Sequence, residues 1–181
     1  SKDPVPLKAV HHIEFWVGNA KQAAFFYRNA FGFNQIAYSG LETGNRDKAS
    51  YVMEQGRVRL VFSTPLNGNN GISTHIKKHG DGVKDIAFHV DDAKACYEAC
   101  VARGAKSASE PTTLEDDNGK VTHASICTYG ETIHSFISHD TYKGPFLPGF
   151  QEDKKSGENV GIKFVDHVVG NVELGKMEEW V

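Results

Sequence analysis

The chain has 181 residues, of which 39% are hydrophobic and 24% are charged, and its formal net charge is −3. This composition is typical of a globular protein, and the length allows one domain with a buried core and a little more. The slightly acidic balance argues against nucleic acid as a partner. No apolar run approaches the roughly 18–20 residues that cross a bilayer, which argues against a membrane partner.

The first half of the chain predicts a strand, a helix and three more strands. Alternating apolar residues indicate a strand over residues 11–17, and apolar residues at helical spacing indicate a helix over residues 20–31. Gly32 is the glycine expected just after a helix C-terminus. The three further strands are predicted at residues 33–39, 48–54 and 57–63, and a polar, glycine-rich loop is predicted at 67–71.

The same order of elements then repeats. A strand is predicted at residues 83–90 and a helix at 91–103, with strands near 105–110, 120–129 and 132–139. The sequence therefore predicts an α+β fold class built from paired βαβββ modules. We expect residues 1–140 to form one domain of two such units. Residues 141–160, which contain Pro145, Pro148 and a charged stretch, are expected to form a linker.

The opening strand pattern returns near the end of the chain. Residues 10–19 (VHHIEFWVGN) are echoed by residues 165–171 (VDHVVGN), each with a histidine in an apolar run that closes on Gly-Asn. A repeat of this kind indicates one supersecondary unit used again. Residues 161–181 are therefore expected to be the first strand and the helix start of a second domain that is incomplete in this sequence.

Strand alternation predicts which residues share a face of the sheet. In the first strand, Ile13, Phe15 and Val17 oppose His12, Glu14 and Trp16. In the strand at 83–90, the odd positions carry Asp85 and His89, whereas the even positions are apolar from Ile86 onward. In the strand at 132–139, Ile133 and Ile137 oppose His134, Phe136 and Ser138. We expect the apolar faces to pack under the helices and the polar-bearing faces to line one shared concavity.

The order of the predicted elements and several sequence motifs resemble those of a known family. The tandem strand-helix-three-strand pattern resembles the vicinal oxygen chelate fold of glyoxalases and extradiol dioxygenases. Within it, the sequence is similar to the 4-hydroxyphenylpyruvate dioxygenase family at residues 15–24 (FWVGNAKQAA), 40–44 (GLETG), 79–88 (HGDGVKDIAF) and 146–150 (FLPGF). The resemblance extends over essentially the whole chain and includes the Asp166-His167 to Gly170-Asn171 segment.

The resemblance implies a specific chemistry. Members of that family convert 4-hydroxyphenylpyruvate and O2 to homogentisate and CO2 in tyrosine catabolism, using Fe(II) held by two histidines and a glutamate. The first of these ligands corresponds to His167, and the other histidine and the glutamate would lie beyond residue 181. The family also implies a cytoplasmic homodimer or homotetramer. On this basis we expect the 181 residues alone to be inactive.

A second metal site within residues 1–140 is a hypothesis of its own. Superposing the repeated motifs places His12 where His167 lies, and Asp85 at the position of the second histidine. The glutamate position falls at His134 or Phe136, and with His134 the set would be two histidines and a carboxylate. The alternative is a vestigial concavity whose buried polar groups hydrogen-bond to one another. His11 is expected to point to the opposite face from His12 and so not to join such a site.

Two other functions fit the same residues. Hydroxymandelate synthase resembles the 4-hydroxyphenylpyruvate dioxygenase family throughout and uses the same substrate and metal, and no motif above separates the two. The other alternative is a non-catalytic module of the same fold that binds a small molecule or a partner in its concavity.

Overall fold

The computed structural model describes residues 3–180 and contains both predicted units. The first unit has the order β1 (Ala9–Trp16), α1 (Ala20–Phe31), β2 (Asn34–Ser39), β3 (Lys48–Gln55) and β4 (Val58–Pro65). The second has β5 (Gly82–His89), α3 (Ala93–Val101), β6 (Ser107–Asp116), β7 (Gly119–Cys127) and β8 (Ile133–Ser138). The α+β prediction of two βαβββ units is therefore confirmed.

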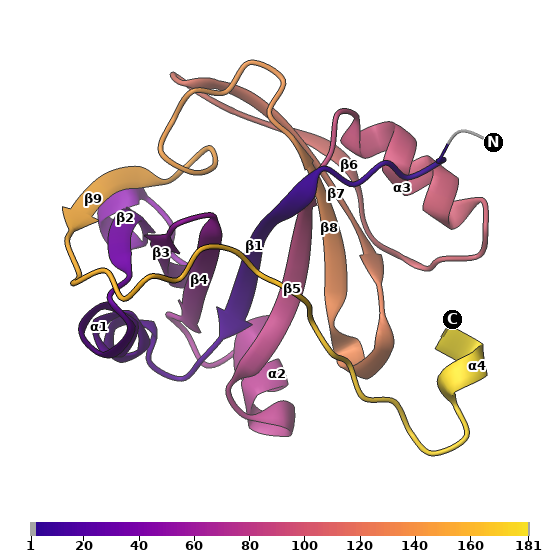
Figure 1. The fold of residues 1–181 in the computed structure, drawn as a ribbon, viewed down its shortest axis with the longest axis horizontal. Helices are drawn as coiled ribbons and strands as arrows, with labels where there is room; N and C mark the ends of the chain where they lie inside the picture. The colour runs from indigo at the N-terminus through magenta and orange to yellow at the C-terminus, as the bar shows by residue number, and fades with distance from the viewer. Residues whose placement is uncertain (1–2, 181) are drawn as a thin grey trace.

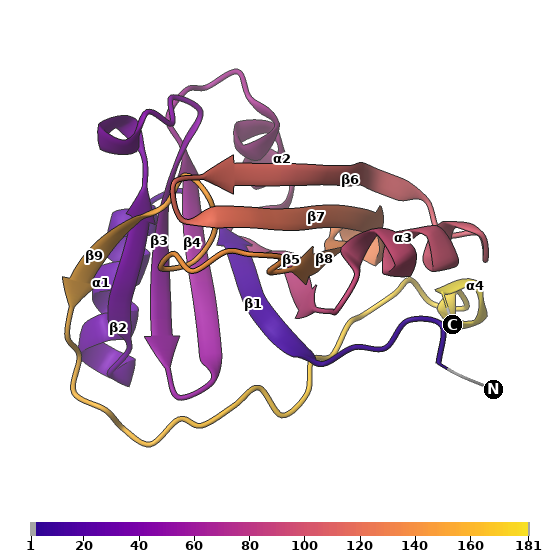
Figure 2. The ribbon, with the colours of Figure 1, turned by 90° about the horizontal axis from the view of Figure 1, so that it is seen from above.

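The strands of both units, with β9 (Gln151–Lys155), form one sheet in the order β6-β7-β8-β5-β1-β4-β3-β2-β9. The two units meet at β1 and β5, which pair antiparallel. Within each unit the first strand pairs in parallel with the last, β1 with β4 and β5 with β8. Figure 1 shows the two halves side by side, and Figure 2 shows their strands running in different directions, so the sheet bends strongly between them.

Each unit packs its helix against the outer face of its own strands. Helix α1 is capped at its start by Asn19, whose side-chain oxygen accepts from the Gln22 N–H, and at its end by Gly32, which has a φ of 69°. Its residues Ala20 and Ala24 join a core with Ile13, Val17 and Phe62, among others. Helix α3 packs in the same way, burying Ala93, Cys96 and Tyr97 against Phe136 and Ala124.

Several elements were not predicted. Helix α2 (Gly71–His79) follows β4, and two one-turn helices, η1 (Leu41–Thr43) and η2 (Tyr129–Glu131), lie in loops. Helix α2 was missed because only Ile72 and Ser73 of its nine residues are buried, so its apolar periodicity is weak. No helix among residues 3–180 is long and apolar enough to cross a membrane.

The segment predicted as a linker at 141–160 is part of the sheet structure. Residues 151–155 form strand β9 (Gln151–Lys155), which pairs antiparallel with β2 at the sheet edge. The strand was missed because its sequence, QEDKK, has no apolar alternation. Before it, Tyr142 and Phe146 are buried against the inner faces of the two units, with Leu147 packed against both clusters. We call residues 142–150 the plug segment, which crosses between the two halves in Figure 2.

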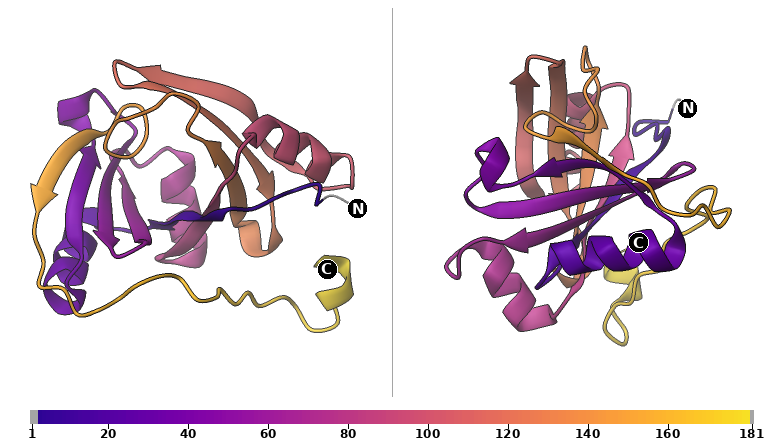
Figure 3. Two further views of the ribbon diagram at one scale, coloured as in Figure 1. Left: turned by 45° about the horizontal axis from the view of Figure 1, so that its top comes forward. Right: turned by 90° about the vertical axis from the view of Figure 1, so that its left-hand side faces the viewer.

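The strand predicted around Asp166 does not form, and no strand follows Lys155 within the described residues. A strand needs the backbone of a neighbour, and this part of the chain instead runs singly along the outer side of the sheet (Figure 3). It is attached by the Arg57 N–H, which donates to the Lys163 carbonyl at 2.7 Å. A short helix, α4 (Met177–Trp180), follows where the helix start was predicted.

The buried side chain of Gln55 joins three separate segments. Its carbonyl oxygen accepts the N–H groups of Val160 and Ile162, each at 3.1 Å, and its amide group donates to the Phe31 carbonyl at 2.6 Å. Gln55 therefore links the β3–β4 hairpin to the end of α1 and to the segment at residues 160–162. Ile162 and Val165 also pack against the core of the first unit.

A pair of glycine substitutions tests the close approach of this chain to α1. A Cβ at Gly32 would lie 1.8 Å from the Glu158 carbonyl oxygen, whereas a Cβ at Gly44 has nothing within 4 Å. Both glycines have positive φ, so alanine costs about 1–2 kcal/mol of backbone strain at either position. We expect Gly32→Ala to lower the free energy of unfolding clearly more than Gly44→Ala in urea titrations. Equal losses would show that residues 157–159 do not pack on α1.

Candidate functional site

Glu14 is the centre of a buried polar network on the inner face of the first unit. Its Oε1 accepts from the Lys48 ammonium at 3.0 Å and from the Ser63 hydroxyl at 2.6 Å, and Ser63 lies 2.7 Å from the Ser50 hydroxyl. Burial alone would raise the pKa of Glu14, but the ammonium and hydroxyl outweigh it and hold the pKa below its ordinary value. Glu14 is therefore an ionised, internally compensated carboxylate.

Asp85 occupies the matching position in the second unit. It is the register partner of Glu14 across the β1–β5 ladder. Its two oxygens accept from the Ser135 N–H at 3.1 Å and the Ser135 hydroxyl at 2.5 Å, and His123 Nε2 lies 3.1 Å from that hydroxyl. Burial raises the pKa of Asp85 to about 7, helped by Glu14 and opposed by the Ser135 donors. The two facing carboxylates thus differ in pKa, and Glu14 is the one that keeps its negative charge more readily.

The position of His11 corrects the sequence prediction. We expected it to point away from His12, but the β1–β5 ladder has a register shift between Val10 and His12. Such an irregularity breaks the strict alternation of side chains. The Nδ1 atoms of His11 and His12 consequently lie 2.8 Å apart, and His11 Nε2 lies 2.7 Å from His139 Nε2. The three imidazoles form a hydrogen-bonded chain.

The plug segment covers this histidine chain. The ring centroid of Phe146 lies 5.6 Å from that of His11 and 5.1 Å from that of His12. Burial, together with the neighbouring imidazoles, moves the pKa of His11 far below its usual range. Burial likewise lowers the pKa of His12 to about 4. Both rings are therefore neutral at physiological pH, and each can donate through one nitrogen and accept through the other.

His134 lies on the opposite face from Asp85, so the hypothetical set of His12, Asp85 and His134 does not assemble. In the parallel β5–β8 ladder His134 is the register partner of Ile86, and its Nδ1 lies 3.2 Å from the Ile86 carbonyl oxygen. Its neighbour Phe136 is buried under α3. The prediction was wrong because it placed the apolar Ile137 under the helix, whereas Ile137 packs on the inner face with Tyr142.

His167 is the predicted iron ligand, and it lies outside the inner face. Its side chain is 74% exposed, and its Nδ1 lies 2.7 Å from Asp166 Oδ2. A carboxylate on one imidazole nitrogen orients the ring and leaves the other nitrogen for a metal, so this residue fits one ligand position. Residues 3–180 contain one group of three potential ligands, and it consists of His75, His79 and Glu131. The described residues therefore do not complete a triad around His167.

The structure does bring His134 and His167 to one small cavity. This cavity, of about 270 Å³, lies on the outer side of β1, β5 and β8 and is also lined by Val10, Phe88 and Asp166. Two candidate ligands that the sequence assigned to different sites are thus neighbours here. Their proximity follows from the path of the chain after β9, which no sequence pattern indicated.

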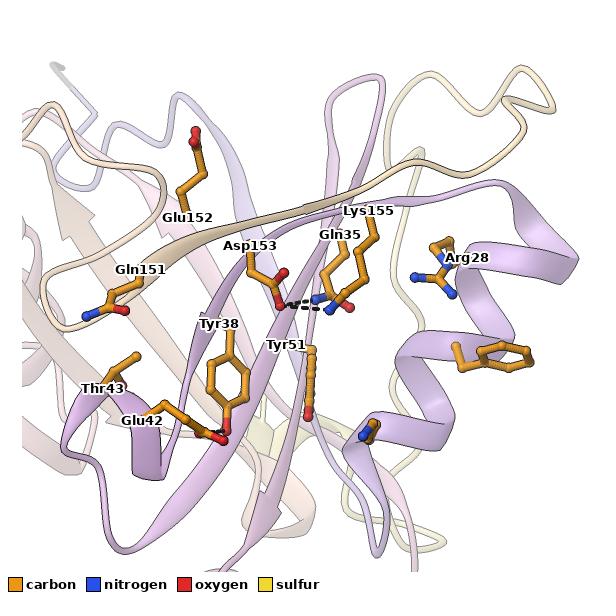
Figure 4. Close-up of a pocket in the computed structure, with 12 residues that line it drawn as sticks. Arg28, Gln35, Tyr38, Glu42, Thr43, Tyr51, Gln151, Glu152, Asp153 and Lys155 are labelled. Atoms are coloured by element: carbon orange, nitrogen blue, oxygen red, sulfur yellow. Dashed lines mark hydrogen bonds and ion pairs between the residues drawn. The ribbon is translucent and has the colours of Figure 1, made fainter.

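An open groove was also missed by the sequence analysis. It has a volume of about 500 Å³ and lies between α1, β2, β3 and β9, with the rings of Tyr38 and Tyr51 on its floor (Figure 4). Tyr38 donates to Glu42 at 2.7 Å, and Asp153 accepts from Gln35 at 2.6 Å and from Lys155 at 2.9 Å. Several of the polar groups along the groove are thus paired with one another.

The chain is similar to proteins of known family. Residues 11–123 match the model of the glyoxalase/bleomycin resistance protein/dioxygenase superfamily. A 4-hydroxyphenylpyruvate dioxygenase of Dictyostelium discoideum is 47% identical over 173 residues, which cover 91% of this chain and 47% of the relative. The corresponding protein of Xenopus tropicalis is 44% identical, with 94% and 46% covered. The chain thus spans about half the length of these relatives.

One solved structure is similar over almost the whole chain. A mutant of 4-hydroxymandelate synthase from Streptomyces coelicolor superposes with a TM-score of 0.80 at 25% identity, covering 97% of this chain and 50% of that one. The described fold therefore corresponds to about half of that synthase structure.

A double-mutant cycle tests the ion pair on the inner face. Lys48→Met leaves Glu14 buried without its cation, and we expect urea titration to show a loss of about 3 kcal/mol in the free energy of unfolding. Combining it with Glu14→Gln should cost less than the sum of the two single changes. The control is Lys8→Met, because Lys8 pairs with Asp91 at the surface and both side chains are largely exposed. If the losses of the two single variants simply added in the double variant, Glu14 and Lys48 would not interact energetically.

The buried histidines predict that acid destabilises the fold. Imidazoles of the unfolded chain take up protons near pH 6.5, whereas folded His12 does so only at about pH 4 and His11 lower still. The unfolded state therefore binds more protons, and stability falls as the pH drops below 6.5. Asp85 acts in the opposite sense, because its raised pKa lets the folded state bind a proton first.

The histidines outnumber Asp85, since the pKa values of His123, His134 and His139 are also lowered by burial. We expect the free energy of unfolding to be about 2 kcal/mol smaller at pH 5 than at pH 7. His11→Gln should flatten this dependence, because the variant lacks an imidazole whose folded-state pKa is far below its usual range. Equal stability of the parent protein at the two pH values would refute the prediction.

Proposed function

The chain belongs to the glyoxalase/bleomycin resistance protein/dioxygenase superfamily, and from this premise we propose that it is the N-terminal part of an Fe(II)-dependent dioxygenase. The reaction proposed is conversion of 4-hydroxyphenylpyruvate and O2 to homogentisate and CO2. The observation that carries the proposal is the 40–47% identity to proteins named 4-hydroxyphenylpyruvate dioxygenase over about nine-tenths of the chain.

The geometry supports a largely non-catalytic role for most of the chain. The inner face, where a vicinal oxygen chelate fold would place a metal site, is covered by Tyr142 and Phe146 of the plug segment. Its carboxylates, Glu14 and Asp85, already have internal partners. We therefore propose that residues 1–140 act as a folded support, and that the domain begun by residues 161–181 carries the reaction centre.

His167 is the residue of this chain that we assign to the iron. Its imidazole is exposed and its Nδ1 is held by Asp166, which leaves Nε2 to bind the metal. When bound, Fe(II) held by two histidines and one carboxylate has open coordination positions for a 2-oxo acid and O2. The remaining histidine and glutamate are proposed to come from the second half of the relatives' length. The family resemblance also supports a cytoplasmic homodimer or homotetramer as part of this proposal.

A second candidate is hydroxymandelate synthesis, favoured by the similarity to the Streptomyces coelicolor structure. It is the weaker candidate, because sequence identity to that protein is 25%, against 47% to the Dictyostelium discoideum dioxygenase. The two candidates share the metal site, so only the product distinguishes them.

The test uses a protein that carries this chain together with the second half found in its relatives. His167→Ala should lower Fe(II) affinity and homogentisate formation by at least about 100-fold, since even outer partners of metal ligands contribute factors of 10–100. His12→Gln should retain both, because His12 lies on the plugged inner face. Products are identified by chromatography, with O2 uptake as a second readout.

The outcomes separate the assignments. Hydroxymandelate as the product would select the second candidate. Retention of iron by the His167→Ala protein together with its loss in His12→Gln would move the metal to the first half of the chain. Turnover of 4-hydroxyphenylpyruvate by the 181 residues alone would refute the proposed division of roles.

A further inference from the structure

Two histidines of α2 and a glutamate of η2 converge at one point of the surface. His75 and His79 are one helical turn apart, so they share a face of α2, and their ring centroids are 4.5 Å apart. Glu131 Oε2 lies 2.7 Å from His79 Nε2 and 3.9 Å from His75 Nδ1. One potential ligand atom from each of the three side chains lies within 4.8 Å of the others.

Glu131 is held in this position by several contacts. It has a positive φ of 63°, which is uncommon for a residue other than glycine. The Lys84 ammonium donates to its backbone carbonyl at 2.5 Å, and the Lys78 ammonium pairs with Oε1. The other carboxylate oxygen, Oε2, is therefore the one directed at the two imidazoles. The carboxylate is fixed by interactions that leave one of its oxygens for a further ligand.

The two imidazoles differ in exposure in a way that suits a metal site. The side chain of His75 is 10% exposed, and it packs against the Trp16 ring in a T-shaped arrangement with a centroid distance of 5.1 Å. His79 is 33% exposed and Glu131 is 51% exposed. One ligand is thus anchored in the protein, while the other two leave an approach from solvent.

We propose that His75, His79 and Glu131 bind a divalent transition metal ion of the zinc class. Two imidazole nitrogens and one carboxylate oxygen are a ligand set that Zn²⁺ accepts, with water in the fourth position. The ion would replace the hydrogen bond between His79 and Glu131 and leave the Lys78 contact with Oε1 in place. It would fasten α2, which precedes β5, to η2, which connects β7 and β8, and so link α2 to the second unit.

This site is separate from the iron ligand proposed above, and the experiment keeps the two apart. The parent for the test is the chain with His167→Ala, so that His167 cannot bind the added metal. Zn²⁺ is titrated into it by isothermal calorimetry, with Mg²⁺ as the control ion, since Mg²⁺ prefers oxygen ligands. We expect one Zn²⁺ per chain and no saturable binding of Mg²⁺.

Three variants test the ligands. Glu131→Gln and His79→Ala change exposed side chains and should each weaken Zn²⁺ binding at least about tenfold. Lys78→Met removes the neighbouring cation and should keep or tighten binding, because the carboxylate then has no competing charge. Zn²⁺ should also raise the melting temperature of the parent, and this rise should disappear in Glu131→Gln.

Opposite results would overturn the proposal. These are the absence of saturable Zn²⁺ binding in the parent up to about 100 µM, or unchanged affinity in Glu131→Gln and His79→Ala. Loss of binding in Lys78→Met alone would show that the cluster is an ion-pair network that does not coordinate a metal.

Discussion

The burial of the plug segment against the inner faces of the sheet is the contact on which the rest of the structure depends. Phe146 packs with Ala37, Val52 and Val61 of the first unit, and Tyr142 packs with Ala87, Val121 and Ile137 of the second. A curved sheet would otherwise present a water-filled hollow. Because these side chains exclude water, each polar group beneath them must find a protein partner, which accounts for the Glu14–Lys48 pair, the Asp85–Ser135 pair and the histidine chain.

The two units share one order of elements, but their buried carboxylates have different partners. Register partners Glu14 and Asp85 occupy equivalent places, yet Lys48 reaches only Glu14, whereas Asp85 has neutral donors from Ser135. Two facing carboxylates in a dry setting ionise unequally, and the nearby cation decides which one keeps its charge. The inner face therefore holds one carboxylate compensated by a cation and one held by neutral donors.

The sequence predicted the architecture well because alternation and helical spacing are local signals. Both βαβββ units, and the end of α1 at Gly32, follow from such patterns. The site was harder to predict, because its details depend on departures from regularity. A register shift turned His11 toward His12, and Ile137 was assigned to the wrong face since an apolar side chain fits either a helix or a plug. Strand β9 pairs with β2 through its backbone and through the Gln35–Asp153 hydrogen bond, and neither interaction leaves an apolar alternation in its own sequence.

The three hydrogen bonds of Gln55 show that the folded first unit includes residues well beyond position 140. A cut made at residue 140 would remove the plug segment and β9, and it would also leave the Gln55 carboxamide without the N–H groups of Val160 and Ile162. A shortened chain intended to preserve this fold should therefore extend at least through Val165, whose side chain packs against the core of the first unit. The stretch of backbone just before His167 is thus structurally part of the first unit, to which Gln55 and the core of that unit attach it.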